Sequence, residues 1–325
     1  MTTSPLHQPA PDAAADRAEF ERAVLDGLSR APRAIPAKFL YDARGSQLFD
    51  QICELPEYYL TRTETKILRA CASNIAELAG PDRALVEFGS GSSVKSRILL
   101  DAMKDLAVYA PIDISRDHLD ATADRLRRDY PRLRVEPVCG DYMAIDSLPD
   151  TVPPRRLGFF PGSTIGNLTP DEAREFLRRA RRLLGDDGAM VIGVDLRKDP
   201  ALLHAAYNDS AGVTAAFTLN LLRRMNRELD ATFDLSSFAH DAFYNADEGR
   251  IEIYFRSLRS QTAMVAGWRF MFAQGERIHT EYSYKYDEPT FAALVDGTGF
   301  RVGHTWTDDD SFFAVHYLVA DRTPD

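Results

Sequence analysis

From Arg83 to about Leu196, short apolar runs alternate with amphipathic stretches. This alternation is typical of βαβ units, in which parallel strands are joined by helices. Thr169, Pro170 and Glu172 form a capping-box start for one of the helices, which we expect to end near Gly185. Strands are predicted at 84–88, 106–112, 132–138, 156–160 and 189–194, and the other helices at 95–104 and 116–129. The pattern therefore predicts an α/β fold around a parallel sheet.

The C-terminal part departs from this pattern. Phe300–Thr307 and Phe312–Val319 are two strand-like runs separated by the acidic turn Asp308–Asp310, which predicts a β-hairpin. A parallel sheet that ends in an antiparallel pair resembles the Rossmann-like sheet of class I S-adenosylmethionine-dependent methyltransferases. We therefore expect that sheet, together with a second lobe that binds the substrate.

The second lobe is predicted from a long insertion between Pro200 and Tyr286. It contains helices through 222–227 and strand-like segments at 250–255 and 261–272. The predicted domains are a disordered tail (1–20), N-terminal helices that join the substrate lobe (21–80), the methyltransferase core (81–199), the substrate-binding insertion (200–286), and a C-terminal helix and hairpin that complete the core (287–325).

Composition limits the classes of function. The chain has 325 residues, of which 45% are hydrophobic and 27% charged, so disorder is excluded as its main state. Thirty-nine basic against 49 acidic residues give a net charge of −10, which disfavours nucleic acid as the main partner. No apolar run approaches the roughly 20 residues of a membrane span, and residues 1–17 lack a signal-peptide core. We expect a cytoplasmic monomer without membrane contact.

No metal site is predicted. The three cysteines, Cys53, Cys71 and Cys139, contain no C-x-x-C pair, and we interpret them as small buried hydrophobic residues. The seven histidines show no metal-ligand spacing.

A candidate cofactor site lies at three successive strand ends. Glu87–Ser93 places Gly89 and Gly91 between the first strand and the first helix, where glycine lets the backbone approach a ligand closely. Asp113 ends the second strand and could accept hydrogen bonds from ribose hydroxyls, and Asp141 follows the third strand. Such features converge on one crevice in open α/β sheets, whereas a tight structural turn is the alternative for the glycines alone.

The glycine turn distinguishes between cofactors. Val94 occupies the last position of an otherwise dinucleotide-like G-x-G-x-x-G, so a nicotinamide-dependent dehydrogenase is disfavoured. A sulfonium cofactor has no phosphate and tolerates an acidic surround, so S-adenosylmethionine fits better. Asp141 and Tyr142 suit adenine, and Lys95 is either a partner for the cofactor carboxylate or a surface lysine at a helix start.

Six sequence blocks carry a resemblance to a known family: residues 41–49 (YDARGSQLF), 55–59 (LPEYY), 61–64 (TRTE), 87–91 (EFGSG), 162–167 (GSTIGN) and 211–214 (AGVT). They resemble the histidine-specific Nα-methyltransferases of ergothioneine biosynthesis, and the match runs from about Pro36 to the C-terminus. The resemblance implies trimethylation of the α-amino group of free L-histidine to hercynine by S-adenosylmethionine.

The resemblance also implies roles for single residues. Thr214 would help indirectly in holding the imidazole, Ile253 stands where a methionine is expected against that ring, and Tyr142 replaces a usual phenylalanine. The departure at Ile253 could loosen selectivity for the substrate side chain, and the one at Tyr142 should have almost no effect on function. The cofactor would be held by Gly89, Lys95, Asp113, Asp141, Tyr142 and Gly162, the amino-acid backbone would be surrounded by Tyr41, Phe49, Tyr58, Asn167 and Tyr207, and the imidazole would be held by Glu281 and Ser283.

The residue types suit this chemistry. Residues 280–284 are strand-like, and the period of two in a strand places Glu281 and Ser283 on one face, where they could address both imidazole nitrogens. An exposed alternating edge strand is the alternative. The faces of Tyr41, Phe49 and Tyr58 could stabilise a quaternary ammonium product, although each could also be an ordinary core aromatic. Tyr41 or a bound water could accept the amine proton.

Two other functions remain open from the sequence. Ile253 motivates an N-methyltransferase that acts on another free amino acid, such as tryptophan. A module that binds S-adenosylmethionine without catalysis is the alternative from a different class.

Overall fold

A computed structural model describes residues 13–91 and 94–321. The chain divides into two compact units. Unit 1 comprises the residues up to Phe49 together with Gly212–Asp241 and Ile253–Glu281, and unit 2 comprises Asp50–Ala211, Ala242–Glu252 and the residues from Tyr282 onward.

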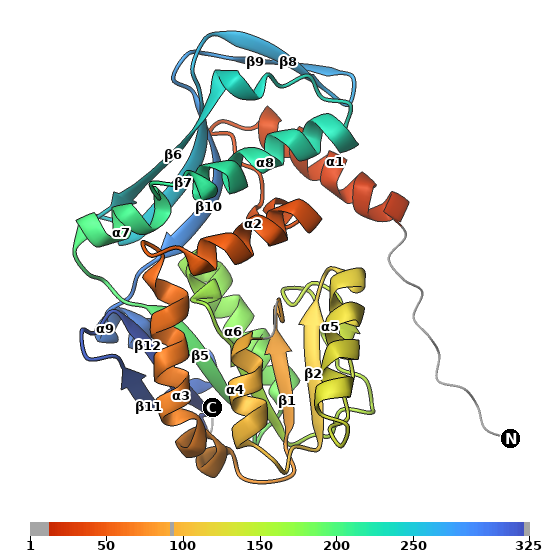
Figure 1. The fold of residues 1–325 in the computed structure, drawn as a ribbon, viewed down its shortest axis with the longest axis vertical. Coiled ribbons are helices and arrows are strands. Elements are labelled where there is room, and N and C mark those ends of the chain that lie inside the picture. Colours follow the sequence, from red (N-terminus) through yellow and green to blue (C-terminus); the bar gives the residue numbers. More distant parts are fainter. Residues whose placement is uncertain (1–12, 92–93, 322–325) are drawn as a thin grey trace, which may run out of the picture. The chain divides into compact units, whose positions relative to one another are not determined.

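Unit 2 contains a seven-stranded sheet (Figure 1). The strand order is β11-β12-β5-β4-β1-β2-β3, and the five strands from β5 to β3 run parallel to one another. β12 is antiparallel to both β5 and β11, so the predicted hairpin is confirmed. The strands are β1 (Ala84–Phe88), β2 (Val108–Asp113), β3 (Val138–Cys139), β4 (Arg156–Phe160), β5 (Ala189–Asp195), β11 (Phe300–Thr307) and β12 (Phe313–Ala320).

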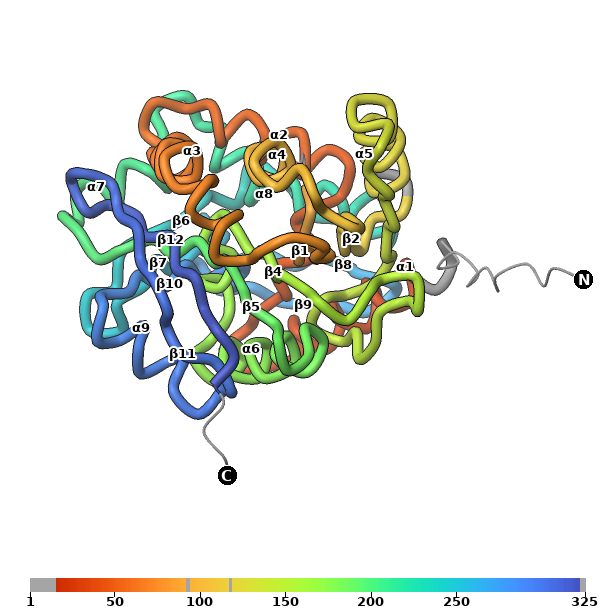
Figure 2. Tube along the Cα trace, turned by 90° about the horizontal axis from the view of Figure 1, so that it is seen from below, coloured from red at the N-terminus to blue at the C-terminus, as the bar shows by residue number. Residues whose placement is uncertain are grey.

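Helices cover both faces of this sheet (Figure 2). α3 (Tyr59–Ala79), α4 (Val94–Ala102) and α5 (Arg116–Asp129) lie along one face, and α6 (Pro170–Leu184) and α9 (Glu288–Val295) lie along the other. The central strands β1, β4 and β5 are consequently almost entirely buried, as their continuous apolar runs indicate. Unit 2 also contains the 3₁₀ turn η2 (Thr164–Asn167), α7 (Pro200–Tyr207) and part of α2 (Ala43–Glu54).

The start of α6 confirms the predicted capping box. The hydroxyl of Thr169 accepts a hydrogen bond from the backbone N–H of Glu172, and the Glu172 carboxylate accepts one from the backbone N–H of Thr169. Pro170 occupies the first helical position, and Gly185 ends the helix with a positive φ of 77°. These local signals fix the helix just after the turn that carries Asn167.

Unit 1 is built on helices and antiparallel strands. It contains α1 (Ala13–Ser29), η1 (Ala37–Leu40), most of α2, α8 (Val213–Glu228), η3 (Leu235–Ser237) and the hairpin of β8 (Gln261–Val265) and β9 (Trp268–Phe272). The second small sheet has the order β10-β7-β6, and each of its strands has residues in both units: β6 (Phe238–Asn245), β7 (Arg250–Ser257) and β10 (Arg277–Tyr284).

The structure corrects two predicted strands. The strand predicted over 132–138 is only Val138–Cys139, with an isolated bridge from Val135 to Tyr109, because Pro111 on β2 has no N–H to donate to this strand between the two pairings. The segment predicted as one strand over 261–272 is a hairpin. Ala266 and Gly267 both have positive φ, at 46° and 81°, as a two-residue hairpin turn requires.

Other sequence-based boundaries also differ from the structure. α1 begins at Ala13, so the tail predicted as disordered over 1–20 is helical in its second part, and residues 1–12 lie outside the described part of the chain. α3, expected in the substrate lobe, belongs to unit 2 and packs on α4, β5 and β12. Cys71 is buried as expected, whereas Cys53 and Cys139 are half-buried.

His316 on β12 is a buried titratable group in unit 2. It is 4% exposed, its ring stacks on Phe291 with centroids 4.2 Å apart, and its Nδ1 lies 2.9 Å from the hydroxyl of Thr305. Burial lowers the pKa of His316 from 6.5 to about 4, because the charged imidazolium is poorly solvated there.

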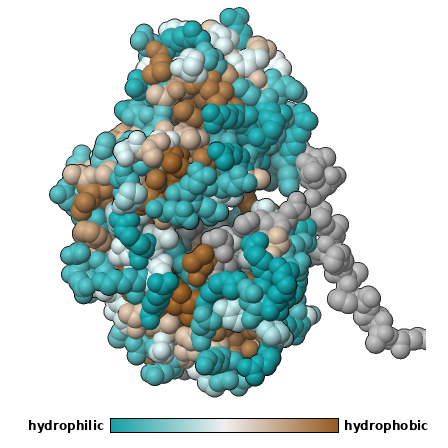
Figure 3. All heavy atoms as spheres, viewed as in Figure 1, coloured by the Kyte–Doolittle hydropathy of each residue, from teal (hydrophilic) through white to brown (hydrophobic). Residues whose placement is uncertain are grey.

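No helix in the described part of the chain is long and apolar enough to cross a membrane. On the face drawn in Figure 3, hydrophilic residues predominate, and hydrophobic residues form small separate patches.

Candidate functional site

The glycine turn and the end of β2 come together in unit 2. Gly89 and Gly91 have positive φ, at 77° and 44°, as expected for a turn that only glycine enters without strain. The Gly91 N–H donates to Oδ2 of Asp113 at 3.3 Å, while Oδ1 of Asp113 accepts from the N–H of Ser115 at 3.0 Å. The turn after β1 is thus tied to the carboxyl end of β2. Ser92 and Ser93 lie outside the described residues.

The end of β3 supplies the next part of this group. Asp141 follows β3, and its Oδ1 accepts a hydrogen bond from the N–H of Met143 at 2.8 Å. A Cβ atom at Gly89 would lie 3.6 Å from the ring of Tyr142, so the glycine turn passes directly over that ring. The structure therefore brings Gly89, Gly91, Asp113 and Tyr142 together, as the convergence of parallel strand ends predicts.

Lys95 and Gly162 meet at a carboxylate that the sequence analysis did not select. Glu64 on α3 pairs with Nζ of Lys95 at 2.5 Å and accepts the Gly162 N–H at 2.9 Å on both oxygens. The Glu64 side chain is 1% exposed and the Lys95 side chain 18%, so the surface-lysine alternative is wrong. Its proposed contact with a cofactor carboxylate stays a prediction.

Gly193 on β5 makes room for this ion pair. A Cβ atom at Gly193 would lie 2.0 Å from Oε1 of Glu64, closer than any real contact. A glycine inside a fully buried strand marks such a close approach, and this was the available sequence signal for Glu64.

A second buried carboxyl lies at the end of β1, just before the glycine turn. Glu87 is 2% exposed and accepts hydrogen bonds from the hydroxyls of Ser96, at 2.6 Å, and Tyr109. Burial raises the pKa of Glu87 to about 7, although both hydroxyls oppose the shift. Glu87 therefore ties the end of β1 to α4 and β2, a role that was not predicted.

Asn167 ends the 3₁₀ turn η2, which packs against β10. A Cβ atom at Gly166 would lie 2.8 Å from the carbonyl oxygen of Tyr284, so glycine is required for this approach. Ser163, in the left-handed region at φ 57°, accepts the N–H of Asp195 on its hydroxyl at 2.9 Å. These contacts fix the turn between β10 and the end of β5.

Three predicted substrate residues form one group in unit 2. The rings of Tyr58 and Tyr207 meet edge to face at 6.1 Å, and the Tyr207 hydroxyl lies 2.8 Å from the hydroxyl of Ser283. Ser283 is 4% exposed. Nζ of Lys285 donates to both hydroxyls at 2.8 Å.

Lys285 belongs to a buried charged cluster that the sequence analysis missed. Its ammonium pairs with Oδ2 of Asp195 at 2.7 Å, and neither side chain is exposed. Asp195 also binds Nζ of Lys198 through Oδ1 at 2.6 Å, and both of its oxygens accept from the Tyr59 hydroxyl at 2.8 Å. The sequence signal for Lys285 was its position two residues after Ser283, because residues two apart in a strand lie on the same face.

The two lysines respond differently to burial. Burial lowers the pKa of Lys198 to about 8, against the raising effect of Asp195. Burial also opposes the charge of Lys285, but there the carboxylate of Asp195 and the oxygen of Tyr207 outweigh it, and the pKa of Lys285 is raised. Lys285 is therefore the firmly charged member of the cluster at neutral pH.

The remaining predicted residues lie in unit 1. The ring of Tyr41 packs edge to face on the rings of Phe49 and Phe217, with centroids 5.5 and 5.3 Å apart. The three rings form an aromatic cluster, and Phe217 is a member that was not predicted from the sequence. Thr214, in the first turn of α8, is buried. Ile253 on β7 is 3% exposed, and its carbonyl accepts from the hydroxyl of Thr280 at 3.0 Å.

Glu281 and Ser283 are both buried on the edge strand β10, at 8% and 4% exposure. The alternative of an exposed alternating strand is therefore wrong.

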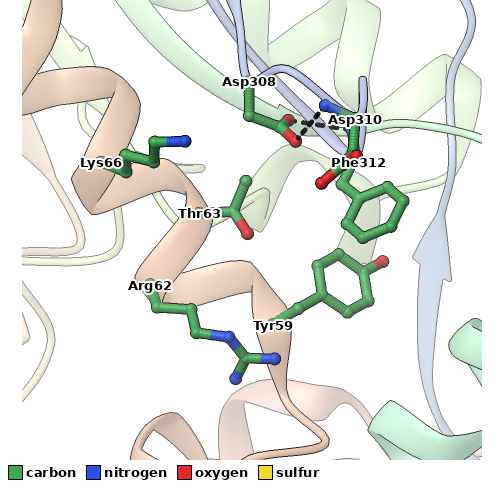
Figure 4. A pocket seen from close by; sticks show the side chains of 7 residues that line it. All are labelled: Tyr59, Arg62, Thr63, Lys66, Asp308, Asp310 and Phe312. Carbon is green, nitrogen blue, oxygen red and sulfur yellow. Dashed lines mark hydrogen bonds between the residues drawn. The ribbon is translucent and has the colours of Figure 1, made fainter.

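Two other features bear on ligand binding. Among the described residues, no group of three or more His, Cys, Asp or Glu side chains could hold a metal ion. A hollow of about 390 Å³ lies between α3 and the β11–β12 turn (Figure 4). Its lining residues are Tyr59, Arg62, Thr63, Lys66, Asp308, Asp310 and Phe312, and none of them is a predicted site residue.

The residues at the strand ends fit S-adenosylmethionine. Asp113 and Asp141 offer carboxylate acceptors for ribose hydroxyls and an exocyclic amine, and the φ values of Gly89 and Gly91 let the backbone approach closely. These side chains are carboxylates, so they suit a positively charged sulfonium better than a negatively charged pyrophosphate.

The chain is similar to known proteins over most of its length. The model of the family described as histidine-specific methyltransferase, SAM-dependent, matches residues 20–320. Histidine N-alpha-methyltransferase of Mycolicibacterium smegmatis is 43% identical over 325 residues, which cover 98% of this chain and 100% of the relative. Its namesake from Mycobacterium tuberculosis is 40% identical over 302 residues, covering 91% and 93%.

A fungal relative matches over part of its length. Ergothioneine biosynthesis protein 1 of Neurospora crassa is 31% identical over 300 residues, which cover 90% of this chain and 34% of the relative. The family model and the two full-length relatives lead to one conclusion: the chain belongs to the family of histidine-specific, S-adenosylmethionine-dependent methyltransferases.

Proposed function

We propose that this protein transfers three methyl groups in succession from S-adenosylmethionine to the α-amino group of L-histidine. The product would be hercynine, and the reaction would be the first step of ergothioneine biosynthesis. The observation that carries the proposal is the family match over residues 20–320, with full-length relatives named for histidine Nα-methylation. The contacts that join Gly89, Gly91, Asp113 and Tyr142 support it.

S-adenosylmethionine supplies the methyl group and leaves as S-adenosylhomocysteine. In each round the neutral amine nitrogen attacks the methyl carbon in line with the carbon–sulfur bond, which breaks with its electron pair on sulfur. The α-ammonium of free histidine loses one proton before the first attack, and the methylated amine loses one after the first and one after the second round, so that the nitrogen is neutral at each attack. The protein's part is alignment and exclusion of water, for which buried, hydrogen-bonded side chains are suited.

The proposed roles divide the site residues into groups. Tyr41 is the candidate acceptor of the amine proton and Asn167 the candidate ligand of the reacting amine, and these two are the proposed catalytic residues. The cofactor would be held by Gly89, Gly91, Lys95, Asp113, Asp141, Tyr142 and Gly162. The amino acid would be bound by Phe49, Tyr58, Tyr207, Thr214, Ile253, Glu281 and Ser283.

The aromatic residues have a further part in this proposal. A trimethylated nitrogen carries a positive charge but no N–H, so hydrogen bonds cannot hold it. Aromatic faces can stabilise such a cation by about 0.5 to 2 kcal/mol each. Tyr41 and Phe49, whose rings lie 5.5 Å apart, and Tyr58 are the candidates.

Mass spectrometry of reactions with single free amino acids tests the function. With S-adenosylmethionine and L-histidine, mono-, di- and trimethylated histidine should appear in sequence, with S-adenosylhomocysteine formed in step. Comparable turnover of tryptophan would contradict the assignment to histidine. Cofactor binding in calorimetry without any S-adenosylhomocysteine in the presence of histidine would indicate a non-catalytic module instead. We also propose that the chain acts as a cytoplasmic monomer. Light scattering measures the molar mass in solution and so tests the oligomeric state.

A further inference from the structure

The buried cluster around Lys285 bears on how the amino acid is bound. The three N–H bonds of its ammonium are all used: one donates to Asp195, one to the Tyr207 hydroxyl and one to the Ser283 hydroxyl, at 2.7, 2.8 and 2.8 Å. An ammonium has three donors and no acceptor, so this geometry satisfies it completely.

The number of protons limits which hydrogen bonds the hydroxyls of Tyr207 and Ser283 can donate. Each hydroxyl oxygen accepts one hydrogen bond from Lys285, and the oxygens of Tyr207 and Ser283 share a hydrogen bond of 2.8 Å between them. Only one of the two hydroxyl protons can lie in that shared bond. The phenol of Tyr207 is the more acidic hydroxyl and donates the shared bond, so the proton of Ser283 is directed to a third group.

We propose that Lys285 is a positioning residue for the amino-acid substrate. Held by Asp195, it fixes the hydroxyls of Tyr207 and Ser283 so that Ser283 presents an oriented O–H donor to that substrate. The inference rests on the proposed function, which assigns Tyr207 and Ser283 to substrate binding. It extends that function to a residue that is 1% exposed and whose ammonium is fully engaged by protein groups.

The charge states support this arrangement. The pKa of Lys285 is raised, so the ammonium keeps its three protons at neutral pH, and burial raises the pKa of Tyr207, so the phenol keeps its proton. Loss of Lys285 would free one lone pair on each hydroxyl oxygen and let both O–H bonds rotate. A preorganised donor would then have to be ordered by the substrate itself, which weakens binding.

Asp195 offers a matched pair of variants. Lys285→Met leaves Asp195 with Lys198 and the Tyr59 hydroxyl, and Lys198→Met leaves it with Lys285 and the Tyr59 hydroxyl. Each variant removes one ammonium from the same carboxylate and keeps two partners, and the lysine side chains are 0% and 4% exposed. Only Lys285 touches Tyr207 and Ser283, so only Lys285→Met should disturb the amino acid.

The experiment measures amino-acid and cofactor affinity separately in the full chain. For Lys285→Met, the KM and calorimetric Kd of histidine should rise by about 10- to 100-fold, the usual effect of losing an oriented hydrogen bond in a buried site. The Kd of S-adenosylhomocysteine should change by less than about 3-fold. Lys198→Met should leave the histidine affinity within about 3-fold of the wild type, at a similar melting temperature to Lys285→Met.

A double-mutant cycle separates positioning from general loss of structure. In the Ser283→Ala background the hydroxyl pair is already broken, so Lys285→Met should add less than about 3-fold to the loss of histidine affinity. Lys198→Met should have the same small effect in both backgrounds. Multiplicative losses for Lys285→Met and Ser283→Ala, or equal losses of histidine affinity in the two lysine variants, would overturn the proposal.

Assays of the wild-type protein distinguish failure of the proposed histidine methylation from failure of the proposed role of Lys285. If the wild type methylates a different amino acid, the assignment to histidine fails, and the same variant series is measured with that amino acid. The role of Lys285 then stands or falls on the cycle alone.

Discussion

Glu64→Gln tests the ion pair that joins α3 to the Gly162 turn. The Glu64 carboxylate is 1% exposed, and it binds the Lys95 ammonium at 2.5 Å and the Gly162 N–H at 2.9 Å. Glutamine keeps one acceptor oxygen for Gly162 but removes the charge opposite Lys95, whose side chain is only 18% exposed.

The size of the effect follows from these contacts. Removing one partner of a buried ion pair costs about 3 to 5 kcal/mol, because the other charge stays buried without compensation. The retained hydrogen bond to Gly162 offsets about 1 kcal/mol of this. We therefore expect the free energy of unfolding to fall by about 2 to 4 kcal/mol, a large part of a typical total of about 5 to 15 kcal/mol.

Urea denaturation at neutral pH measures this change. Glu77→Gln is the matched control, because Glu77 lies on the same helix α3 but is exposed, and its variant should stay within about 0.5 kcal/mol of the wild type. A loss below about 1 kcal/mol for Glu64→Gln, or equal losses in the two variants, would refute the reasoning that Lys95 depends on the buried carboxylate.

Three further predictions follow from single features. Gly193→Ala should destabilise the fold at least as much as Glu64→Gln, because its Cβ would lie 2.0 Å from Oε1 of Glu64; a fully stable variant in the same urea assay would contradict this. The pKa of His316 is lower in the folded state, about 4, than its ordinary 6.5, so the unfolded chain binds more protons between these values and stability is lost as pH falls from 6.5 to about 4, by up to about 3 kcal/mol. His316→Gln should make that decline shallower, and denaturation curves that show the same pH dependence in both proteins would rule out His316 as its source. Asp113→Ala should weaken binding of S-adenosylhomocysteine far more than that of histidine in calorimetry, and Glu281→Ala should do the reverse. Equal losses of both ligands in either variant would remove that residue from its proposed role.

Much of unit 2 could be predicted because its signals are local. Thr169, Pro170 and Glu172 form their capping box within one turn of chain, and the strands β1 and β5, apolar apart from Glu87 and Asp195, have the composition of central strands in a covered sheet. The strand over 132–138 was overestimated for a reason outside its own segment, since the missing N–H belongs to Pro111 on the neighbouring strand β2. The hairpin at Ala266 and Gly267 was missed because alanine rarely adopts the positive φ that this turn requires.

The candidate site could be predicted only in part. Asp113 and the glycine turn were found because the carboxyl ends of parallel strands meet at one edge whatever the remaining sequence is. Glu64, Asp195 and Lys285 were not found, since a charged side chain in a sequence is expected in solvent unless its partner is known. Their partners lie far away along the chain, with Glu64 and Lys95 31 positions apart and Asp195 and Lys285 90 positions apart.

The sequence by itself determined the order of strands and helices, the glycine turn after the first strand, and the resemblance to a methyltransferase family. These properties depend on hydrophobic period, backbone restrictions and short motifs, which act between residues close in the chain. Only the tertiary structure decided that Lys95 is paired with Glu64, and that Lys285 holds the hydroxyls of Tyr207 and Ser283. Burial of a charge is stable only when an opposite charge and hydrogen-bond partners reach the same point in space, and that meeting is a property of the folded chain.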